Sequence, residues 1–313
     1  MRYSSFHFFA EQECFEIKEN ESSKRSALSV RAFMAFAKSI RPGWRANTLA
    51  GLLIFLLKAL GIRKKVAQYN IQLCFPDKTP RERARIISES YSSMVWTGVE
   101  LLAWQKDPSL IDRMAAEVSG RSYIDEALAA GHGVIMFSAH IGSWEYGAAW
   151  LARNYHCQAV VRHSDSAFQR ELIEEMREAS GLVTISKDAS MKRVITLLRH
   201  NGVFAVLADQ HGGNEGIPVP FFGHTTSSAA GPAFFSMLTG APMIPLLPRR
   251  IAPFKFSIEI SKPLPAPDKS LSRNEAAAEL TASMNREYER MITEDPGQWL
   301  WQHRRFREEM ERR

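Results

Sequence analysis

Short apolar runs and segments of helical periodicity alternate along the chain from residue 133 onward. The run 133–139 is almost continuously apolar, which is typical of a strand covered on both faces. Strands that alternate with helices of this length indicate βαβ units. The pattern predicts an α/β fold with a largely parallel or mixed sheet flanked by helices. The expected strands are 133–139, 158–163, 182–186, 203–209, 242–250 and 254–261, and the expected helices are 144–154, 166–180, 189–200, 229–239 and 273–293.

The chain before this alternation is mainly helical in pattern. Residues 66–104 keep a helical period, and Asp77 or Thr79 is expected to cap the helix that begins near Pro80. A short helix is expected over 123–130. We found no internal repeat and no Pro/Gly/Ser-rich linker, so the prediction is one α/β domain over 67–313, preceded by an N-terminal helical segment.

The N-terminal segment 26–66 is apolar and basic at once. Its longest run without a charge, Ala46–Leu57, is too short to span a bilayer, which needs about 20 apolar residues. Basic residues flank this run on both sides, and they serve no packing purpose. The composition therefore favours a membrane-associated helix on an anionic leaflet, with a helix packed on the protein body as the alternative. Residues 1–25 lack the apolar core of a signal peptide and are expected to be weakly ordered.

The net charge of the chain limits the classes of partner that we expect. The 313 residues carry a formal net charge of +6, which suits an anionic surface or substrate such as acidic phospholipid or a phosphorylated sugar. No nucleic-acid reading motif is present, so nucleic acid is not expected as a partner. The three cysteines, Cys14, Cys74 and Cys157, are far apart and form no metal-binding spacing, which argues against a disulfide framework.

Several reactive side chains follow the expected strands directly. His140 comes after 133–139, and Glu145 lies in the first turn of the next helix. Arg162 ends the following strand, and Asp209 with Gln210 follows the strand 203–209. In an open α/β sheet, ligands bind beyond the carboxyl ends of the strands. A base, carboxylates and a guanidinium are therefore expected to converge at one sheet edge, although each alone is more often a structural residue.

Two other chemistries fit the sequence poorly. His140, Glu145 and His211 are conceivable zinc ligands, but HEXXH is absent and the chain has no Cys/His cluster, so no metal site is expected. A serine nucleophile is also disfavoured, because the stretch GSWEYG is not a GxSxG elbow.

Five blocks in order give the chain a family resemblance, running from about residue 63 to residue 306. They are RKKVAQYNIQLCFPDKTPRERARI with Asn70, HIGSWE (140–145), VVRHSDSAF (160–168) with EEMREASG (174–181), the central stretch LADQHGGNEGIPVPFFGHTTSSAAGPAFFSMLTGAPMIP, and PGQWLWQHRRF. Together they resemble the bacterial lipid A biosynthesis acyltransferases, the late lauroyl and myristoyl transferases. The His-x4-Asp/Glu element is shared with the wider glycerolipid acyltransferases, so the resemblance implies a glycerolipid-acyltransferase-like fold. The chain departs from the pattern of this family at two places. Its N-terminal apolar run is short, so the sequence leaves open whether the segment spans the membrane or lies at its surface, and His211 stands where the family often has an acidic residue.

The resemblance implies transfer of an acyl chain from a thioester to a hydroxyl. The expected acceptor is a phosphorylated glycolipid, a precursor of lipid A, and the expected donor is acyl-carrier protein or acyl-CoA, with no cofactor. The implied location is the cytoplasmic face of the inner membrane. Rival interpretations are a phosphatidylinositol mannoside or a lysophospholipid as acceptor, a non-catalytic lipid-binding module, and a thioesterase that uses water.

Catalytic roles follow from the same resemblance. His140 is expected to be the general base, because the ordinary pKa of His, about 6.5, lies near working pH. Glu145 is expected to accept the other ring N–H of His140, and Arg162 to bind an oxyanion or a phosphate. Asp209 is expected to orient Arg162 or the acceptor.

The remaining expected contacts concern the substrates. Backbone N–H groups of Gly142, Ser143 and Trp144 are candidate oxyanion donors, and Gln210 is a candidate substrate ligand. Phe221, Phe222 and Gly223, with the apolar helix 233–238, line either an acyl-chain groove or plain core. Four arginines are expected to meet phosphates or to form a solvated basic face: Arg249, Arg250, Arg304 and Arg305.

Overall fold

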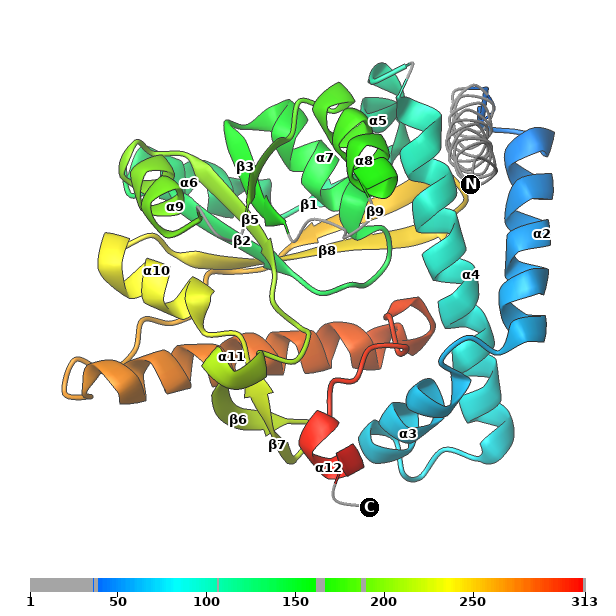
Figure 1. Cartoon of the computed structure of the whole chain (residues 1–313). Coiled ribbons are helices and arrows are strands. Elements are labelled where there is room, and N and C mark those ends of the chain that lie inside the picture. Colours follow the sequence, from blue (N-terminus) through cyan, green and yellow to red (C-terminus); the bar gives the residue numbers. More distant parts are fainter. Residues whose placement is uncertain (1–35, 37–38, 106, 162–166, 187–189, 312–313) are drawn as a thin grey trace, which may run out of the picture.

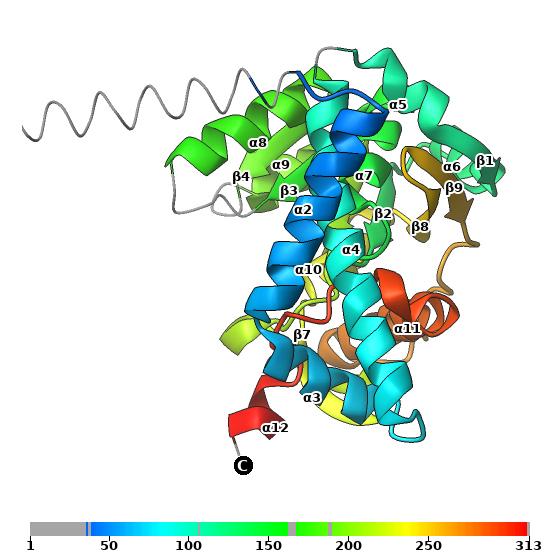
Figure 2. The same ribbon diagram turned by 90° about the vertical axis from the view of Figure 1, so that its right-hand side faces the viewer.

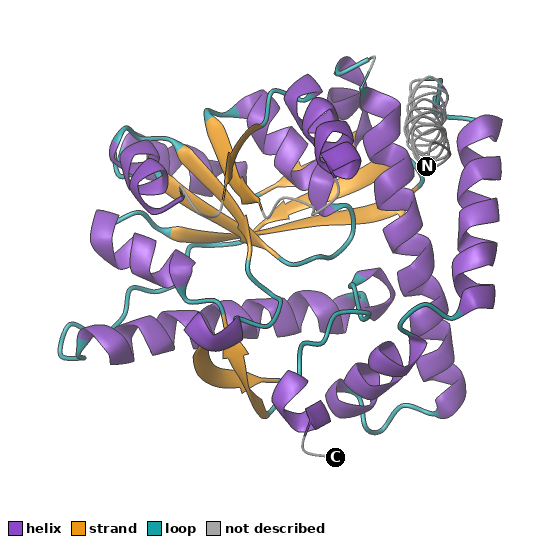
Figure 3. Ribbon diagram, in the orientation of Figure 1, coloured by secondary structure: helices purple, strands orange, loops and turns teal. Residues whose placement is uncertain are grey.

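A computed structural model describes residues 36, 39–105, 107–161, 167–186 and 190–311 (Figure 1). The expectations of weak order for residues 1–25 and of a site at Arg162 fall outside these residues. One twisted sheet crosses the molecule, and helices lie above and below it (Figure 3). The fold is therefore α/β, as the alternating pattern predicts.

The main sheet has seven strands in the order β1-β9-β8-β2-β5-β3-β4. Five neighbouring strands from β8 to β4 are parallel, whereas β9 runs antiparallel to β8 and β1 runs parallel to β9. The sheet is thus mostly parallel but mixed. Its strands are β1 (Ala115–Ser119), β2 (Val134–Ser138), β3 (Cys157–Val161), β4 (Val183–Ser186), β5 (Val203–Leu207), β8 (Met243–Ala252) and β9 (Lys255–Ile260).

Alternating residues of β2 enter the two halves of the core. Val134 and Met136 pack on one face of the sheet, and Ile135 and Phe137 pack on the other. All five β2 residues are buried, which explains the apolar run in the sequence. The first core includes residues from α6 (Arg121–Ala129), α7 (Trp144–Asn154) and α8 (Ala167–Ala179); the second includes residues from α9 (Ser190–Arg199), α10 (Gly231–Thr239) and α11 (Arg273–Glu294).

The long helix α4 (Pro80–Trp104) borders both halves of the core (Figure 1). Thr79 and Glu82 form a capping box at its start, which decides between the two expected caps in favour of Thr79. Ser272 caps α11 in the same way, through Glu275. Strong local signals therefore set the starts of the two longest helices.

Two helices cover the outer side of α4. Helix α2 (Trp44–Leu60) runs alongside it, and α3 (Lys64–Cys74) follows after a bend of 84° (Figure 2). Neither helix alone is long and apolar enough to cross a bilayer; the bent pair passes that test only by combined length and composition. The expected helical segment before residue 66 is confirmed for its described part, whereas its contact with a membrane stays a prediction.

Helix α2 carries apolar residues both on the side that packs on the protein and on its exposed side. Ala46 and Ala50 are its buried residues, and they pack in the core that α4 also lines. Leu49, Ile54 and Leu57 pack partly against the same core, whereas the other large apolar side chains are exposed. Its exposed hydrophobic residues are Trp44 (73%), Leu52 (55%), Leu53 (37%), Phe55 (67%), Leu56 (43%) and Leu60 (71%). An exposed apolar face of this kind needs a covering surface.

Several short elements lack a signal in the sequence. The strand β1 carries exposed residues at most positions, and β6 (Ile217–Phe221) with β7 (His224–Ser228) forms a separate antiparallel hairpin within a stretch rich in Gly and Pro. The expected helix 123–130 begins earlier, as α6. Also present are α5 (Ser109–Met114), α12 (Arg307–Glu311) and the 3-10 turns η2 (Gly213–Glu215) and η3 (Pro296–Gln298).

Candidate active site

The site lies at the carboxyl ends of two neighbouring parallel strands. His140 follows β2, and Asp209 follows β5, which pairs directly with β2. Strand pairing therefore brings together two residues that are far apart in the sequence. The convergence expected at this sheet edge is confirmed for His140 and Asp209.

Asp209 holds the imidazole of His140 in place. Its Oδ1 atom lies 2.7 Å from His140 Nδ1, and its Oδ2 atom accepts the backbone N–H of His140 at 2.9 Å. The indole N–H of Trp299 donates to the same Oδ2 at 2.7 Å. An ionised carboxylate is an acceptor only, so Nδ1 carries the proton and Nε2 is left with a lone pair.

The side chains of His140 and Asp209 differ in how deeply they are buried. The side chain of Asp209 is 1% exposed, whereas that of His140 is 19% exposed. The amide nitrogen of Gln210 lies 3.5 Å from His140 Nε2, so the adjacent residue borders the open side of the ring. In the neutral ring, Nε2 is therefore unprotonated and faces the Gln210 amide, in a side chain that is partly exposed.

The pKa values of the pair move apart. Burial lowers the pKa of His140, but the charge and the hydrogen bond of Asp209 outweigh it, so the pKa lies above its ordinary value. Burial raises the pKa of Asp209, but His140 and the donated hydrogen bonds lower it to about 2. Asp209 is therefore ionised at neutral pH, and it stabilises the protonated form of His140.

Glu145 does not contact His140, contrary to the expectation from the sequence. Its two carboxylate oxygens accept from Arg177 Nε at 3.0 Å and from Arg177 Nη2 at 2.6 Å. The first turn of α7 directs Glu145 toward α8, where Arg177 lies within the EEMREASG stretch. Asp209 therefore takes the orienting position that the sequence assigned to Glu145, and Glu145 fastens α7 to α8.

The turn between His140 and α7 depends on Gly142. Its φ is +61°, and a Cβ there would lie 1.9 Å from the carbonyl oxygen of Pro248. Its N–H donates to Gln298 O at 3.2 Å, and the Ser143 N–H donates to Pro248 O at 3.1 Å. Two of the three expected oxyanion donors are therefore already engaged. The Ser143 hydroxyl is buried and makes no capping hydrogen bond.

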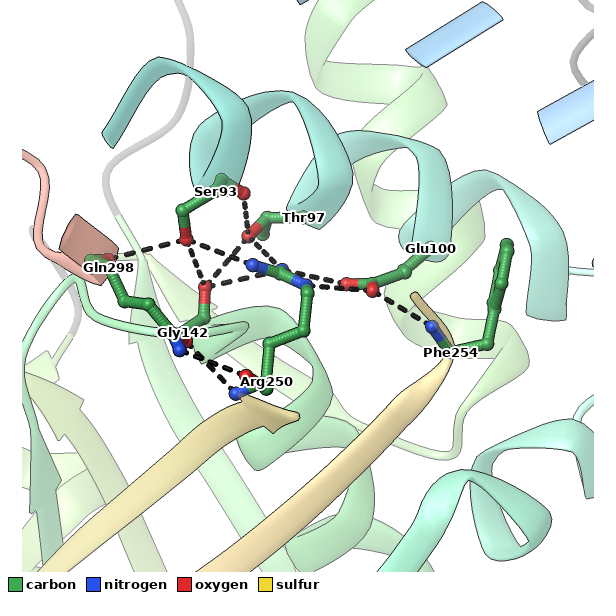
Figure 4. Close-up of polar contacts among 7 residues, drawn as sticks. All are labelled: Ser93, Thr97, Glu100, Gly142, Arg250, Phe254 and Gln298. Atoms are coloured by element: carbon green, nitrogen blue, oxygen red, sulfur yellow. Dashed lines mark hydrogen bonds and ion pairs between the residues drawn. The ribbon is translucent and has the colours of Figure 1, made fainter. Parts of the chain in front are cut away.

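A buried ion pair supports this turn from behind (Figure 4). Arg250 donates to Glu100 through Nε and Nη2, both at 2.8 Å. Arg250 Nη2 also lies 3.3 Å from the Gly142 carbonyl oxygen. The hydroxyls of Ser93 and Thr97 lie 3.2 and 3.0 Å from that oxygen and accept from Arg250. Three side chains thus hold the carbonyl group of Gly142, two residues after His140, and Glu100 holds one of them, Arg250.

The C-terminal segment closes the site from the other side. The Leu300 N–H donates to His140 O at 3.0 Å, next to the bond from Trp299 to Asp209. Asn70 of α3 donates to the carbonyl oxygens of Trp301 and His303, at 2.8 and 2.7 Å. The Asn70 block and the PGQWLW block are therefore joined in space. The PGQWLWQHRRF block was the signal in the sequence, but the sequence alone did not show that Asn70 is its partner in space.

Other expected ligands are placed differently. Phe221 is fully buried and packs against Phe222, Trp299 and Phe306, so it belongs to the core and offers no groove. Gly223, with φ of +76°, forms the turn between β6 and β7. These positions are structural, which is the second of the two roles that the sequence left open.

The four arginines that were expected to bind phosphate lie in different environments. Arg250 and Arg305 are buried, and Arg249 forms an ion pair with Glu294 at 2.6 Å. Burial lowers the pKa of Arg305 to about 10. Arg304 is exposed. The expectation of a shared basic face is therefore wrong for Arg250 and Arg305, which are needed inside the fold.

A narrow cavity of about 60 Å³ lies between α7 and the sheet. Trp144, Glu145 and Arg177 line it together with small and branched apolar side chains of β2, β3 and β5. Its wall is suited to an aliphatic group. Within the described residues no cluster of three or more metal-ligating side chains is found, and the prediction of a metal-free site stays untested.

Most of the chain matches one family model. Residues 28–308 match the model of the bacterial lipid A biosynthesis acyltransferases. The chain belongs to that family. Its membership confirms the resemblance read from the five blocks, and it places His140 and its neighbours in an acyltransferase.

Individual relatives agree with the family assignment. The lipid A biosynthesis lauroyltransferase of Escherichia coli K12 is 27% identical over 82% of this chain and 83% of its own length. The palmitoleoyltransferase of the same organism is 26% identical over 78% and 79%. A phosphatidylinositol mannoside acyltransferase of Mycobacterium tuberculosis is 27% identical over 50% of this chain and 51% of its own length.

A solved structure is also similar, at a greater distance. The 1-acyl-sn-glycerophosphate acyltransferase of Thermotoga maritima covers 77% of this chain and 95% of its own, with 14% identity and a TM-score of 0.35. A likeness this distant does not bear on the site. The glycerolipid-acyltransferase-like detail of the expected fold therefore stays a prediction, whereas the mixed α/β sheet is confirmed.

Proposed function

We propose that this acyltransferase moves a fatty acyl chain from an acyl thioester to a hydroxyl of a lipid A precursor, at the cytoplasmic face of the inner membrane. The observation that carries the proposal is the His140–Asp209 pair, with Nδ1 held at 2.7 Å and Nε2 in a long contact of 3.5 Å with the Gln210 amide, in a side chain that is 19% exposed. The family and its E. coli members support lipid A as the acceptor. The donor is a substrate, carried by acyl-carrier protein or coenzyme A, and no cofactor is proposed.

In the proposed reaction His140 acts as a general base. The acceptor oxygen attacks the thioester carbonyl carbon while its proton passes to Nε2 of His140. Asp209 accepts the Nδ1 hydrogen and stabilises the imidazolium that forms. When the tetrahedral intermediate collapses, the C–S bond breaks and His140 returns the proton to the leaving thiolate. The products are an ester and a free thiol, without an acyl-enzyme.

The oxyanion needs donors, and the start of α7 offers them. The first N–H groups of a helix have no acceptor inside the helix, and the dipole favours negative charge there. With Gly142 and Ser143 engaged elsewhere, the Trp144 N–H is the remaining donor of the three that the sequence indicated. We assign the oxyanion to this end of α7. Gln210 is kept as a substrate ligand beside Nε2.

The outward face of α2 supports membrane attachment. Its small residues pack inward, and Phe55 and Leu60 are 67% and 71% exposed. A lipid acceptor and a face of this kind belong on the same surface, because the acceptor's chains lie in the bilayer. We propose interfacial attachment through α2.

A second acceptor class has one observation in its favour, the similarity to phosphatidylinositol mannoside acyltransferases. That match covers a smaller share of each chain than the E. coli relatives do. A non-catalytic lipid-binding module is disfavoured, because the His140–Asp209 pair is intact and one ring nitrogen is open. Hydrolysis of the donor by the same site remains a side reaction to measure.

The test is a paired assay with a radiolabelled acyl donor. The parent protein and the His140→Ala variant are given donor with and without the tetra-acylated lipid A precursor. We expect transfer by the parent and a loss on the order of 10²–10⁴-fold in the variant. Equal transfer by both proteins would refute the proposed base. Donor consumption without transfer to this lipid would move the acceptor to another glycolipid or a lysophospholipid, and fatty acid release unaffected by acceptor would indicate a thioesterase.

A further inference from the structure

A basic pocket is lined by residues of α2, α3 and α4, the three helices whose arrangement Figure 2 shows. Its volume is about 520 Å³, and three cations line it: Lys58 from α2, Lys64 from α3 and Arg83 from α4. Among the described residues, no carboxylate lines the pocket. The remaining lining residues are Gln68, Gln72, Pro80, Ala84, Ile87, Ser88 and Tyr91.

The three cations have no counter-ion within the part of the chain that the structure describes. Neighbouring charges are paired among themselves: Glu82 receives hydrogen bonds from Thr79, and Arg85 pairs with Glu89 at 3.2 Å. Three like charges that converge on one hollow repel one another, so their arrangement favours binding of an anion.

The chemistry of the lining matches a phosphate group. A guanidinium presents a planar pair of donors to phosphate oxygens, and lysines add compact charges. The amide groups of Gln68 and Gln72 add donors on the same wall, because positions 64, 68 and 72 follow one face of α3. A smaller hollow of about 270 Å³ shares Gln72 and Arg83, which extends the space available to a substituent on the phosphate.

The neighbouring surface indicates a lipid as the carrier of that phosphate. Phe55 lies three positions before Lys58, on the same side of α2, and is 67% exposed. Ile62, just beyond the end of α2, is 45% exposed. Apolar side chains beside a basic pocket match the two parts of an anionic phospholipid, whereas free phosphate would use only the pocket.

The pocket is separate from the active site. Asn70 and the other buried residues of α3 face the C-terminal segment that carries Trp299, whereas Lys64, Gln68 and Gln72 occupy another face of the helix. We propose that this pocket binds the phosphate of an anionic membrane phospholipid and fixes the orientation of the protein on the leaflet. The proposal rests on the proposed membrane attachment and not on acyl transfer.

The experiment measures binding to vesicles by flotation, at constant ionic strength and without acyl donor or acceptor. The site variant is Lys58→Gln/Lys64→Gln/Arg83→Gln. The control variant removes the same charges at exposed positions on other elements, Arg193→Gln/Lys262→Gln/Lys269→Gln. Vesicles consist of phosphatidylcholine alone or of phosphatidylcholine with phosphatidylglycerol. Because no reaction takes place, the result is independent of the proposed catalytic function.

We expect the site variant to bind the phosphatidylglycerol vesicles roughly a hundredfold more weakly than the parent, about fivefold for each basic residue near an anionic leaflet. The control variant should lose much less, and binding to phosphatidylcholine alone should be the same for all three proteins. Equal weakening of both variants would overturn the pocket, because general charge would then explain binding.

Three further measurements keep the outcome decisive. The unfolding temperatures of the site variant and the control variant are compared. The single variants Arg83→Lys and Arg83→Gln are also compared, and Arg83→Lys should weaken binding less, because it keeps the charge although it loses the planar guanidinium. Inorganic phosphate is then tested alone. If it raises the unfolding temperature of the parent and not of the site variant, while vesicle binding is equal in both, the ligand is free phosphate and the lipid assignment is wrong.

Discussion

Two buried carboxylates lie near the turn that begins at His140, and they differ in what they leave open. Glu100 is bound by Arg250 on both oxygens, and every nitrogen of that guanidinium has an acceptor. Asp209 is equally buried, but Nε2 of its partner His140 faces the amide nitrogen of Gln210 at 3.5 Å, a longer and weaker contact than those of Arg250. The first pair is closed and can only support structure. The second pair is open on one side, which is what proton transfer needs.

The number of hydrogen-bond partners that each pair has distinguishes a structural pair from a catalytic one more reliably than burial or charge alone. The Arg250–Glu100 pair fixes the Gly142 carbonyl, and the same turn positions the ring of His140. Removing the closed pair should therefore act first on stability, and removing the open pair should act first on rate. Four variants test that distinction, from the largest expected effect to the smallest.

Asp209→Asn should have the largest effect on the rate. The amide oxygen can accept from His140 Nδ1, but the NH2 group that replaces Oδ2 cannot accept from the His140 N–H and the Trp299 indole N–H, and the charge that stabilises the imidazolium is lost. We expect kcat to fall on the order of 10²–10⁴-fold. The free energy of unfolding should fall as well, because the His140 N–H and the Trp299 indole N–H lose their acceptor, but by less than the barrier rises; denaturant titration checks this. A loss of stability that matches or exceeds the rise in the barrier would contradict the division.

The same variant should shift the pH dependence of the reaction. His140 must be neutral to act as a base, so activity rises as pH rises through its pKa. Because Asp209 raises that pKa, the acid limb of kcat/KM in the parent should lie above 6.5. Without the Asp209 charge, burial acts with little opposition and the limb should fall below its position in the parent. An unchanged limb would mean that another group controls it.

Glu100→Ala should act on stability instead. It leaves the Arg250 guanidinium buried without its counter-ion, which costs about 3–5 kcal/mol in comparable buried pairs. The free energy of unfolding from guanidinium titration measures this loss. The control is the double variant Glu100→Met/Arg250→Met, which should recover most of the stability. Its transfer rate should stay low, because the Gly142 carbonyl has lost Arg250; full recovery of rate would show that the pair only fills space.

Gly142→Ala should strain the turn itself. A residue with a side chain is disfavoured at a φ of +61° by about 1–2 kcal/mol, and its Cβ would also meet Pro248 O at 1.9 Å. Gly131→Ala is the matched control, since Gly131 has a φ of +81° but no atom within 4 Å of a built Cβ. We expect Gly142→Ala to lose more stability and, unlike the control, to lower kcat. Equal effects of the two substitutions would show that the close contact with Pro248 O does not cause the loss at Gly142.

The sequence predicted the sheet and most of its helices, because βαβ periodicity and strong caps are local signals. It located His140 and Asp209 at strand ends for the same reason. It could not give the strand order, so it could not show that β5 lies next to β2. That order pairs residues 69 positions apart, and the sequence offered Glu145 in their place because it was near in the chain. The buried role of Arg250 was hidden in the same way, since its partners are on α4.

Glu145→Gln should therefore have the smallest effect of the four, although the sequence pattern gave this residue a catalytic role. The amide can keep one hydrogen bond to Arg177, and the contact of His140 with Asp209 is untouched. The Glu145 charge contributes to the raised pKa of His140, after the effects of burial and Asp209, so the acid limb should move slightly downward. We expect kcat to fall by less than about tenfold, a change of under about 1.4 kcal/mol in the barrier. Single-turnover rates measured across pH decide the point: a loss comparable to that of Asp209→Asn would make Glu145 the orienting carboxylate during the reaction, and the open pair seen at His140 would then be a resting arrangement.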